Sequence, residues 1–274
     1  MSDVTAHYSR GNLLERLEAA LKDDGVDPRR PDLERLAPYD HFHGRGIEAT
    51  REMADALEIA PADHILDIGS GIGGPARYMA QRFGCRVTGI DLTAEFCEVA
   101  RHLSGLLGFA GKTEFEQGDA LVMPFGNATF DGAYSMNVSM NIDDKAAFYR
   151  EIRRVLKPGG WLMLSEIARG SGAEVDYPTP WARSAQASFL ATMEDTVRGL
   201  ERAGFEIEHS RDTREQTLAF GARSRELVER GEKPPHRAVQ LMHGEIAAQA
   251  MANTARALAE HRVVPVEILT RKRT

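Results

Sequence analysis

The chain has 274 residues, of which 42% are hydrophobic and 27% are charged, and its formal net charge is −7. This balance is typical of a globular protein and argues against general nucleic-acid binding, which needs a basic surface. No apolar run is long enough to cross a bilayer and the N-terminus lacks the apolar core of an export signal, so we expect a cytoplasmic protein without membrane contact. The only two cysteines, Cys85 and Cys97, fit reduced thiols better than a disulfide framework.

The first 58 residues are expected to form a helical lid over a main domain that spans residues 59–274. Leucines at helical spacing predict one amphipathic helix over residues 13–21 and a shorter one around residues 33–36. Residues 39–46 then gather aromatic, histidine and glycine residues without periodicity, which predicts a loop, and a helix follows over residues 47–57. Loops of this composition beside a ligand turn often carry functional groups, so Tyr39, His41 and His43 are candidate catalytic residues. The two histidines have no third ligand at a suitable spacing, and we expect no metal.

The most informative stretch is residues 64–75 (HILDIGSGIGGP). An apolar run, a cluster of glycines and a proline predict a strand, a tight turn and the start of a helix. The glycine spacing satisfies the dinucleotide-binding fingerprint. However, Asp67 is a poor neighbour for a pyrophosphate and a good neighbour for a cationic ligand such as S-adenosylmethionine (SAM). A strand-end aspartate that only caps the turn remains an alternative.

Four further strands alternate with helices after this turn, over residues 85–90, 113–116, 130–135 and 161–167. This alternation predicts a doubly wound α/β fold with a parallel sheet, whose ligands bind at the carboxyl ends of the strands. Asp67, Asp91, Asp119 and Asn137 all fall at such ends. A carboxylate at Asp91 suits the two hydroxyls of a ribose, although a helix N-cap is also compatible, and Asp119 suits the exocyclic amine of adenine.

The C-terminal part of the chain is predicted to complete the acceptor pocket. An irregular loop carries Trp181 and Phe189, and a sixth strand follows over residues 205–209. A helical insertion at about residues 211–262 precedes a last strand over residues 263–269; it fits either the acceptor pocket or a subunit contact, and hence a homodimer. His243 within the insertion is expected to be a packed or exposed helical residue. Asn141, Asp143 and Asp144 resemble magnesium ligands, but helix capping is the simpler explanation.

Four segments together resemble the motif series of class I SAM-dependent methyltransferases: LDIGSGIGG at 66–74, GID at 89–91, GDA at 118–120 and LKPGG at 156–160. The resemblance covers about residues 40–210. It implies a Rossmann-like seven-stranded sheet whose last strand is antiparallel, with SAM held by the glycine turn. The cofactor-binding residues that it implies are Asp67, Gly69, Ser70, Gly71, Gly73, Asp91, Leu92, Gly118, Asp119, Ala120 and Met136.

A narrower resemblance concerns residues 39–43 (YDHFH), 47–51 (IEATR) and 139–142 (SMNI). These segments resemble sarcosine/dimethylglycine-type N-methyltransferases and related natural-product methyltransferases, which implies a small-molecule acceptor, with an amine favoured. The candidate catalytic residues are then Tyr39, His41, His43 and Asn137, and the candidate substrate-binding residues are Asn141, Trp181 and Phe189. Those relatives usually carry histidine at the position of Asn137, so a base role is not carried over to it.

The sequence therefore predicts in-line transfer of a methyl group from SAM to a small molecule, with release of S-adenosylhomocysteine (SAH). Methylation of an oxygen or carbon atom in a secondary metabolite is the nearest alternative. An NAD-dependent oxidoreductase and a SAM-binding protein without catalysis are alternatives from other classes. The Asn-Pro-Pro-aromatic motif of DNA-adenine and protein-glutamine methyltransferases is absent after the fourth strand, which argues against those substrates.

Overall fold

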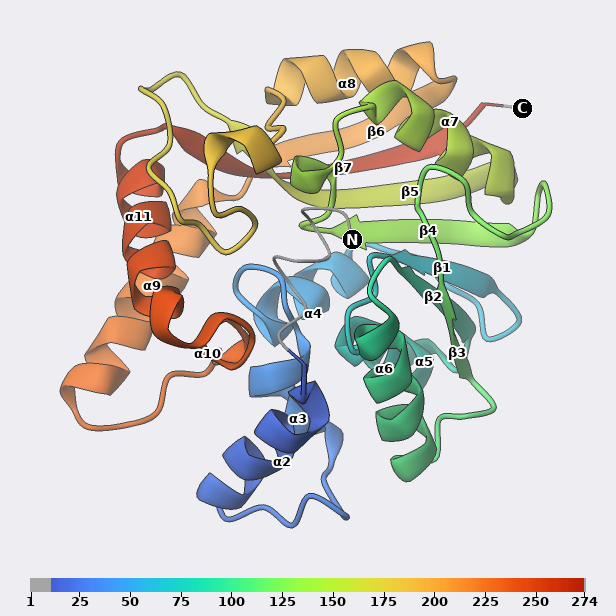
Figure 1. The fold of residues 1–274 in the computed structure, drawn as a ribbon. Coiled ribbons are helices and arrows are strands. Elements are labelled where there is room, and N and C mark those ends of the chain that lie inside the picture. The colour runs from blue at the N-terminus through green and yellow to red at the C-terminus, as the bar shows by residue number, and fades with distance from the viewer. Residues whose placement is uncertain (1–10, 274) are drawn as a thin grey trace.

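A single seven-stranded sheet with helices on both faces forms the centre of the molecule in the computed structural model, which describes residues 11–273 (Figure 1). The strand order is β3-β2-β1-β4-β5-β7-β6. Strands β1 to β5 pair in parallel, whereas β7 is antiparallel to both β5 and β6. The predicted α/β fold with an antiparallel last strand is confirmed. Within the described residues, no helix is long and apolar enough to cross a membrane.

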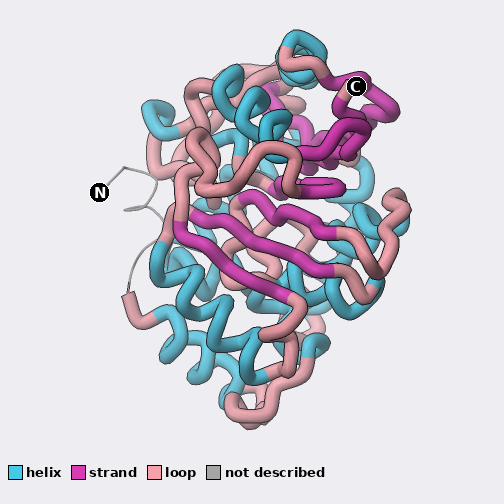
Figure 2. Tube along the Cα trace, turned by 90° about the vertical axis from the view of Figure 1, so that its right-hand side faces the viewer, coloured by secondary structure: helices cyan, strands magenta, loops and turns pink. Residues whose placement is uncertain are grey.

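The strands agree with the predicted ones to within a few residues, except at the start of the fifth. They are β1 (His64–Ile68), β2 (Arg86–Asp91), β3 (Thr113–Gln117), β4 (Phe130–Met136), β5 (Leu156–Arg169), β6 (Phe205–Asp212) and β7 (Val263–Lys272). The fifth strand was expected to begin at residue 161, but β5 already begins at Leu156, and its register with β4 shifts between Phe130 and Gly132. The Pro-Gly-Gly segment is thus an irregularity within the strand, as glycine and proline in strands often are. Figure 2 shows the strands side by side as one twisted sheet.

The helices before β1 and between the parallel strands are α2 (Leu13–Asp23), α3 (Leu33–Asp40), α4 (Ile47–Asp55), α5 (Gly74–Phe83), α6 (Ala94–Leu106), α7 (Lys145–Val155) and α8 (Met193–Arg202). The predicted insertion between β6 and β7 contains α9 (Arg214–Glu229), α10 (Ala238–His243) and α11 (Ala247–Ala259). Three short 3-10 turns complete the chain: η1 (Ser139–Asn141), η2 (Ala185–Ala187) and η3 (Gly244–Ile246).

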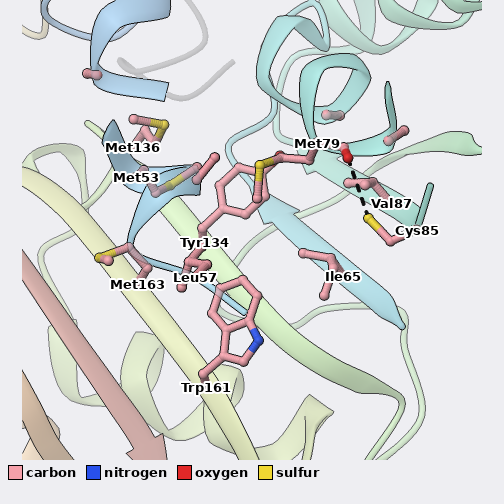
Figure 3. Close-up of a cluster of buried hydrophobic side chains, with 14 of the residues drawn as sticks. Met53, Leu57, Ile65, Met79, Cys85, Val87, Tyr134, Met136, Trp161 and Met163 are labelled. Atoms are coloured by element: carbon pink, nitrogen blue, oxygen red, sulfur yellow. Dashed lines mark hydrogen bonds between the residues drawn. The ribbon is translucent and has the colours of Figure 1, made fainter. Parts of the chain in front are cut away.

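Two hydrophobic cores cover the two faces of the sheet, because successive strand residues point to opposite sides. Ile65 faces a core with Met53 of α4 and Met79 of α5, whereas Leu66 faces a core with Phe148 and other residues of α7. Figure 3 shows the first core, in which sulfur and aromatic side chains interlock around β1, β4 and β5. Cys85 lies in this core as a free thiol, and Cys97 is likewise buried and free.

A third core joins the N-terminal helices to the insertion. The buried leucines of α2 and α3 pack with Phe96 and Leu103 of α6 and with Leu241 and Met242 of α10, and Figure 1 shows α10 beside α2 and α3. The backbone amide of Leu13 also donates a hydrogen bond to Glu95 Oε1 at 2.7 Å. In contrast, α4 contributes to the core of the sheet itself, so the predicted lid contacts the main domain through two different cores.

A fully buried arginine fastens α3 to the first crossover helix. Arg77 of α5 has no exposed surface, and its Nη2 donates to Asp40 Oδ2 at 2.9 Å and to the carbonyl of Ile72 at 2.8 Å. Its Nη1 donates to Ser104 Oγ at 3.3 Å. Burial alone would raise the pKa of Asp40, but His41 and Arg77 hold that pKa below its ordinary value. Asp40 is therefore an anion at neutral pH, and the pair links three elements beneath the glycine turn.

We predict that Asp40→Ala lowers the free energy of unfolding by about 3–5 kcal/mol, because Arg77 is left as a buried charge without its partner. Urea denaturation followed by circular dichroism measures this change. The matched control is Asp40→Leu combined with Arg77→Met, which removes both charges and should recover much of the loss. An Asp40→Ala variant as stable as the wild type would show that the pair does not hold the lid.

Candidate active site

A cavity of about 460 Å³ opens at the carboxyl ends of β1, β2 and β4. This is the edge of a parallel sheet at which ligands bind, and the volume is in the usual range for small-molecule sites. Its wall combines the turn after β1, the ends of β2 and β4, the loop at 118–121, the segment 140–144, and residues 180–181 and 238–243. Eight of the predicted cofactor residues line it: Gly69, Gly71, Asp91, Leu92, Gly118, Asp119, Ala120 and Met136.

The glycine turn lies directly against this cavity. Gly69 and Gly71 have φ angles of 73° and 53°, which L side chains rarely adopt. A Cβ on Gly71 would lie 2.9 Å from the Phe42 ring, and one on Gly69 would collide with Val138. The amide of Gly71 donates to Asp91 Oδ2 at 2.9 Å. Sterics and this hydrogen bond together hold the turn against the end of β2.

The two predicted nucleoside-binding carboxylates differ in their surroundings. Asp91 accepts from Gly71 and, through Oδ1, from the amide of Thr93 at 2.8 Å. Burial nevertheless raises its pKa above the ordinary value. Asp119 is exposed at the rim and accepts from the amide of Leu121 at 2.8 Å. Each oxygen still has lone-pair capacity for a further donor, so both carboxylates can bind hydroxyl or amino groups of a ligand.

Three predicted cofactor residues lie behind the cavity wall. Asp67, Ser70 and Gly73 are not among the lining residues. Gly73 packs against Phe115 and Arg77, and the Ser70 side chain packs against Gly89 of β2. Burial, with a contribution from the nearby charge of Asp91, raises the pKa of Asp67 to about 7. These residues shape the turn, and direct cofactor contact by them stays a prediction.

The lid packs against the first residue of α5. A Cβ on Gly74, which begins this helix, would collide with the backbone oxygen of Asp40 and lie 2.8 Å from its Cγ. The Asp40 carboxylate itself is paired with Arg77 and His41 and does not line the cavity. This close contact fixes where the end of α3 docks on α5.

The segment after β4 forms the floor of the cavity and is held by a buried glutamate. Asn137 has a φ angle of 58°, a left-handed conformation that asparagine tolerates, and it lines the cavity as predicted. Glu166 of β5 accepts from the amides of Val138 at 3.0 Å and Ser139 at 3.1 Å. Burial raises the pKa of Glu166 to about 7. Glu166 was not predicted as part of the site, because the position of a charged residue within a strand does not indicate which backbone amides it will face.

The other three candidate catalytic residues lie outside the cavity wall. The Tyr39 hydroxyl donates to Asp24 Oδ2 at 2.8 Å, inside the lid. His43 is buried, and its Nε2 lies 2.9 Å from the Gly46 carbonyl and 3.1 Å from Thr50 Oγ1; burial holds its pKa well below the ordinary value. His41 Nδ1 lies 2.7 Å from Asp40 Oδ1. The loop instead presents Phe42 to the cavity, and catalytic roles for Tyr39, His41 and His43 stay predictions.

Two of the three candidate substrate residues, Asn141 and Trp181, line the cavity. Phe189 does not line it, and the backbone amide of Phe189 donates to the carbonyl of Met140 at 2.7 Å. The Trp181 indole donates to Ser188 Oγ at 2.9 Å, and Asn141 Nδ2 donates to the Trp181 carbonyl at 2.7 Å. These hydrogen bonds hold the Trp181 and Asn141 side chains in place within the cavity wall. Among residues 11–273 there is no group of three or more histidines, cysteines or carboxylates placed to hold a metal ion.

The insertion supplies part of the cavity wall, one of the two roles expected for it. His243 was expected to be a packed or exposed helical residue; it is packed at the end of α10 and lines the cavity with Ala238, Val239 and Met242. Helix α10 reaches this position because it packs on α2 and α3. Only the tertiary contacts between segments about 200 residues apart reveal this placement.

A second hollow, of about 570 Å³, lies at the other end of the strands and is basic. Arg150, Arg153, Arg154, Arg202 and Lys272 line it. The arginines lie near the C-terminal ends of α7 and α8, where cations stabilise the negative end of the helix dipole. Arg154 is bound to Glu151, and Lys272 donates to the carbonyl of Leu156. This hollow is explained by helix capping and is separate from the candidate active site.

The raised pKa of Asp67 predicts a specific pH dependence of stability. In the unfolded chain this carboxyl ionises above about pH 4, but in the folded protein it stays protonated until about pH 7. The folded state therefore loses stability as the pH rises from about 4 to 7. Asp67→Asn should remove this loss, raising the free energy of unfolding by up to about 4 kcal/mol above pH 7 and by less at pH 5.

Denaturation curves of the ligand-free protein at pH 5 and pH 8 measure this difference. Asp23→Asn is a suitable control, because the Asp23 side chain is 86% exposed. An equal effect of Asp67→Asn at both pH values would rule out the raised pKa.

Comparison with known proteins agrees with this geometry. Residues 66–164 match a family model described as a methyltransferase domain. The chain is 33% identical over 184 residues to a phosphoethanolamine N-methyltransferase of Triticum aestivum; the match covers 67% of this chain and 35% of that protein. The chain thus spans about a third of the length of this relative.

Two solved structures show the same fold at low sequence identity. One is the [4+2]-cyclase SpnF, with a TM-score of 0.69, 23% identity and coverage of 95% of this chain and 94% of that one. The other is a phosphoethanolamine N-methyltransferase 2 of Haemonchus contortus bound to phosphomonomethylethanolamine and SAH, with a TM-score of 0.72, 18% identity and coverage of 96% and 61%. The match shows a methyltransferase domain over residues 66–164, and the motif series and the strand order agree with it.

Proposed function

We propose that the protein binds SAM in the cavity at the carboxyl ends of β1, β2 and β4 and transfers its methyl group to a small-molecule acceptor, with an amine favoured. The observation that carries this proposal is the convergence of the glycine turn, Asp91 and Asp119 on one cavity. Methylation of an oxygen or carbon atom remains the alternative, since the fold serves all three.

The residues on the wall fit this cofactor. SAM carries an adenosine, an ammonium group and a sulfonium, and no phosphate. Asp91 is placed to accept from ribose hydroxyls, and Asp119 from the adenine amine. The wall offers carboxylates to a cationic ligand and no described lysine or arginine to a pyrophosphate. The cavity therefore suits SAM better than NAD.

SAM, when bound, supplies a methyl group on a positively charged sulfur, which a nucleophile displaces in line. The chain's task is then mainly to align the acceptor and exclude water, and such alignment contributes several kcal/mol to catalysis. Phe42 and Met242 close the cavity from the lid and from the insertion, while the Glu166-bound segment at 137–139 fixes its floor. An in-line displacement of this kind needs no covalent intermediate on the protein.

His243 is the best-placed proton acceptor. Apart from aspartates, it is the only titratable side chain among the described residues of the wall. An ammonium acceptor must lose a proton before its nitrogen can attack, and an imidazole accepts protons near neutral pH. His243 thus takes the role that the sequence analysis gave to Tyr39, His41 and His43.

Calorimetry with SAH tests the cofactor site. We expect saturable SAH binding and no comparable binding of NADH. Asp91→Ala should weaken SAH binding about 10- to 150-fold, because one or two hydrogen bonds to a carboxylate contribute about 1.5–3 kcal/mol. Asp119→Ala should weaken it less, since Asp119 is exposed. Binding of NADH without SAH would contradict the proposal.

Isotope-labelled SAM tests the transfer. Incubation with a panel of small amines, phenols and sugars, followed by mass spectrometry, should give a labelled amine. His243→Gln should then lower kcat about 10²- to 10⁴-fold and flatten the rise of rate with pH. His102→Gln, an exposed histidine on α6, is the matched control. An unchanged pH profile in His243→Gln would exclude His243 as the proton acceptor.

A further inference from the structure

The aspartates are the only acidic or basic side chains, apart from His243, among the described residues of the cavity wall. Four aspartates line it, Asp91, Asp119, Asp143 and Asp144, and neither lysine nor arginine occurs among the described lining residues. Two of them belong to the proposed nucleoside site. The other two, Asp143 and Asp144, are exposed and lie beside Asn141 and Ile142. An anionic group in the acceptor half of the cavity would meet only like charges.

Three cations that lie near lining residues in the chain, Lys145, Arg77 and Arg45, are bound elsewhere. Lys145 follows Asp144 directly, but its Nζ donates to the carbonyls of Ser139 at 2.7 Å and Ile142 at 2.8 Å. Arg77 is buried against Asp40, and Arg45 is buried against Glu52 at 2.7 Å. Releasing any of them toward a ligand would break a buried or partly buried polar contact, which is costly.

The remaining surface of the acceptor half is apolar. Met140, Ile142, Pro180, Trp181 and Met242 line it. The polar atoms of the Trp181 and Asn141 side chains make hydrogen bonds within the wall, to Ser188 Oγ and to the Trp181 carbonyl. These groups offer hydrocarbon and aromatic surface, on which affinity grows with the apolar area of a ligand.

The described part of the chain has no group of three or more histidines, cysteines or carboxylates placed to hold a metal ion by itself. A phosphate group that enters without its own metal counter-ion would meet carboxylates and no described lysine or arginine on this wall. Burial of charge without a counter-charge is strongly unfavourable.

We propose that the acceptor of this protein is an apolar molecule that is neutral or positively charged and carries no phosphate. This inference rests on the proposed function for the identity of the cavity. It separates the chain from relatives named for phosphoethanolamine, although their methyltransferase domains are similar in sequence. The substrate class then follows from the insertion and from the segment 140–144, which lie against the acceptor rather than the cofactor.

The test uses a series of three compounds with one hydrocarbon chain and different charges: geranylamine, geraniol and geranyl diphosphate. Each competes with the neutral fluorescent probe N-phenyl-1-naphthylamine for the full-length protein saturated with SAH. We expect saturable probe binding that both geranylamine and geraniol displace, and at least tenfold weaker displacement by geranyl diphosphate. Displacement by the diphosphate at equal or lower concentration, or no probe binding by protein that binds SAH, overturns the inference.

A charge-reversal variant makes the test independent of the shape of the probe. Asp143→Lys places a cation on the wall and should strengthen the binding of geranyl diphosphate at least fivefold, with little change for geraniol or SAH. Glu114→Lys is the matched control, because Glu114 is exposed on the edge strand β3 and does not line the cavity. Equal effects of the two variants contradict the inference. SAH calorimetry tests the proposed function separately. A failure of the proposed function can therefore be told apart from a failure of this inference.

Discussion

The buried ion pair between Arg77 and Asp40 is the interaction on which the rest of the site depends. It joins the first crossover helix to the end of α3, and it places the Asp40 carboxylate against the first turn of α5. The loop that follows Asp40 therefore runs along the mouth of the glycine turn. Phe42 thereby becomes part of the cavity wall.

The cavity has two halves with different physical character. The cofactor half is built from backbone conformation: positive φ angles at Gly69 and Gly71, and amide hydrogen bonds to Asp91. The acceptor half is built from apolar side chains on the insertion and on the loops after β4 and β5. Backbone geometry of this kind is shared wherever the motif occurs, whereas the side chains of the acceptor half are free to differ.

The fold by itself does not decide the reaction, since one neighbour of the same architecture is a [4+2]-cyclase. What distinguishes the present site is chemical. Its wall carries carboxylates, one buried imidazole and no described lysine or arginine. We infer that such a wall favours cationic and apolar ligands over phosphates, because its carboxylates attract cations and repel anions.

The sequence by itself determined the parallel part of the sheet, the glycine turn and the aspartates at the strand ends. These features depend on local patterns: alternating strands and helices, and glycines where the backbone requires them. Asn137, Asn141 and Trp181 were expected at the site and line the cavity, whereas Tyr39, His41, His43 and Phe189 were expected there and lie outside its wall. His243 was expected only to be a packed or exposed helical residue, and its place on the wall was not foreseen. Only the tertiary structure decided these placements, because they follow from how α3 docks on α5 and how α10 docks on α2 and α3. Contacts between such distant segments leave no periodic or spacing signal in the chain.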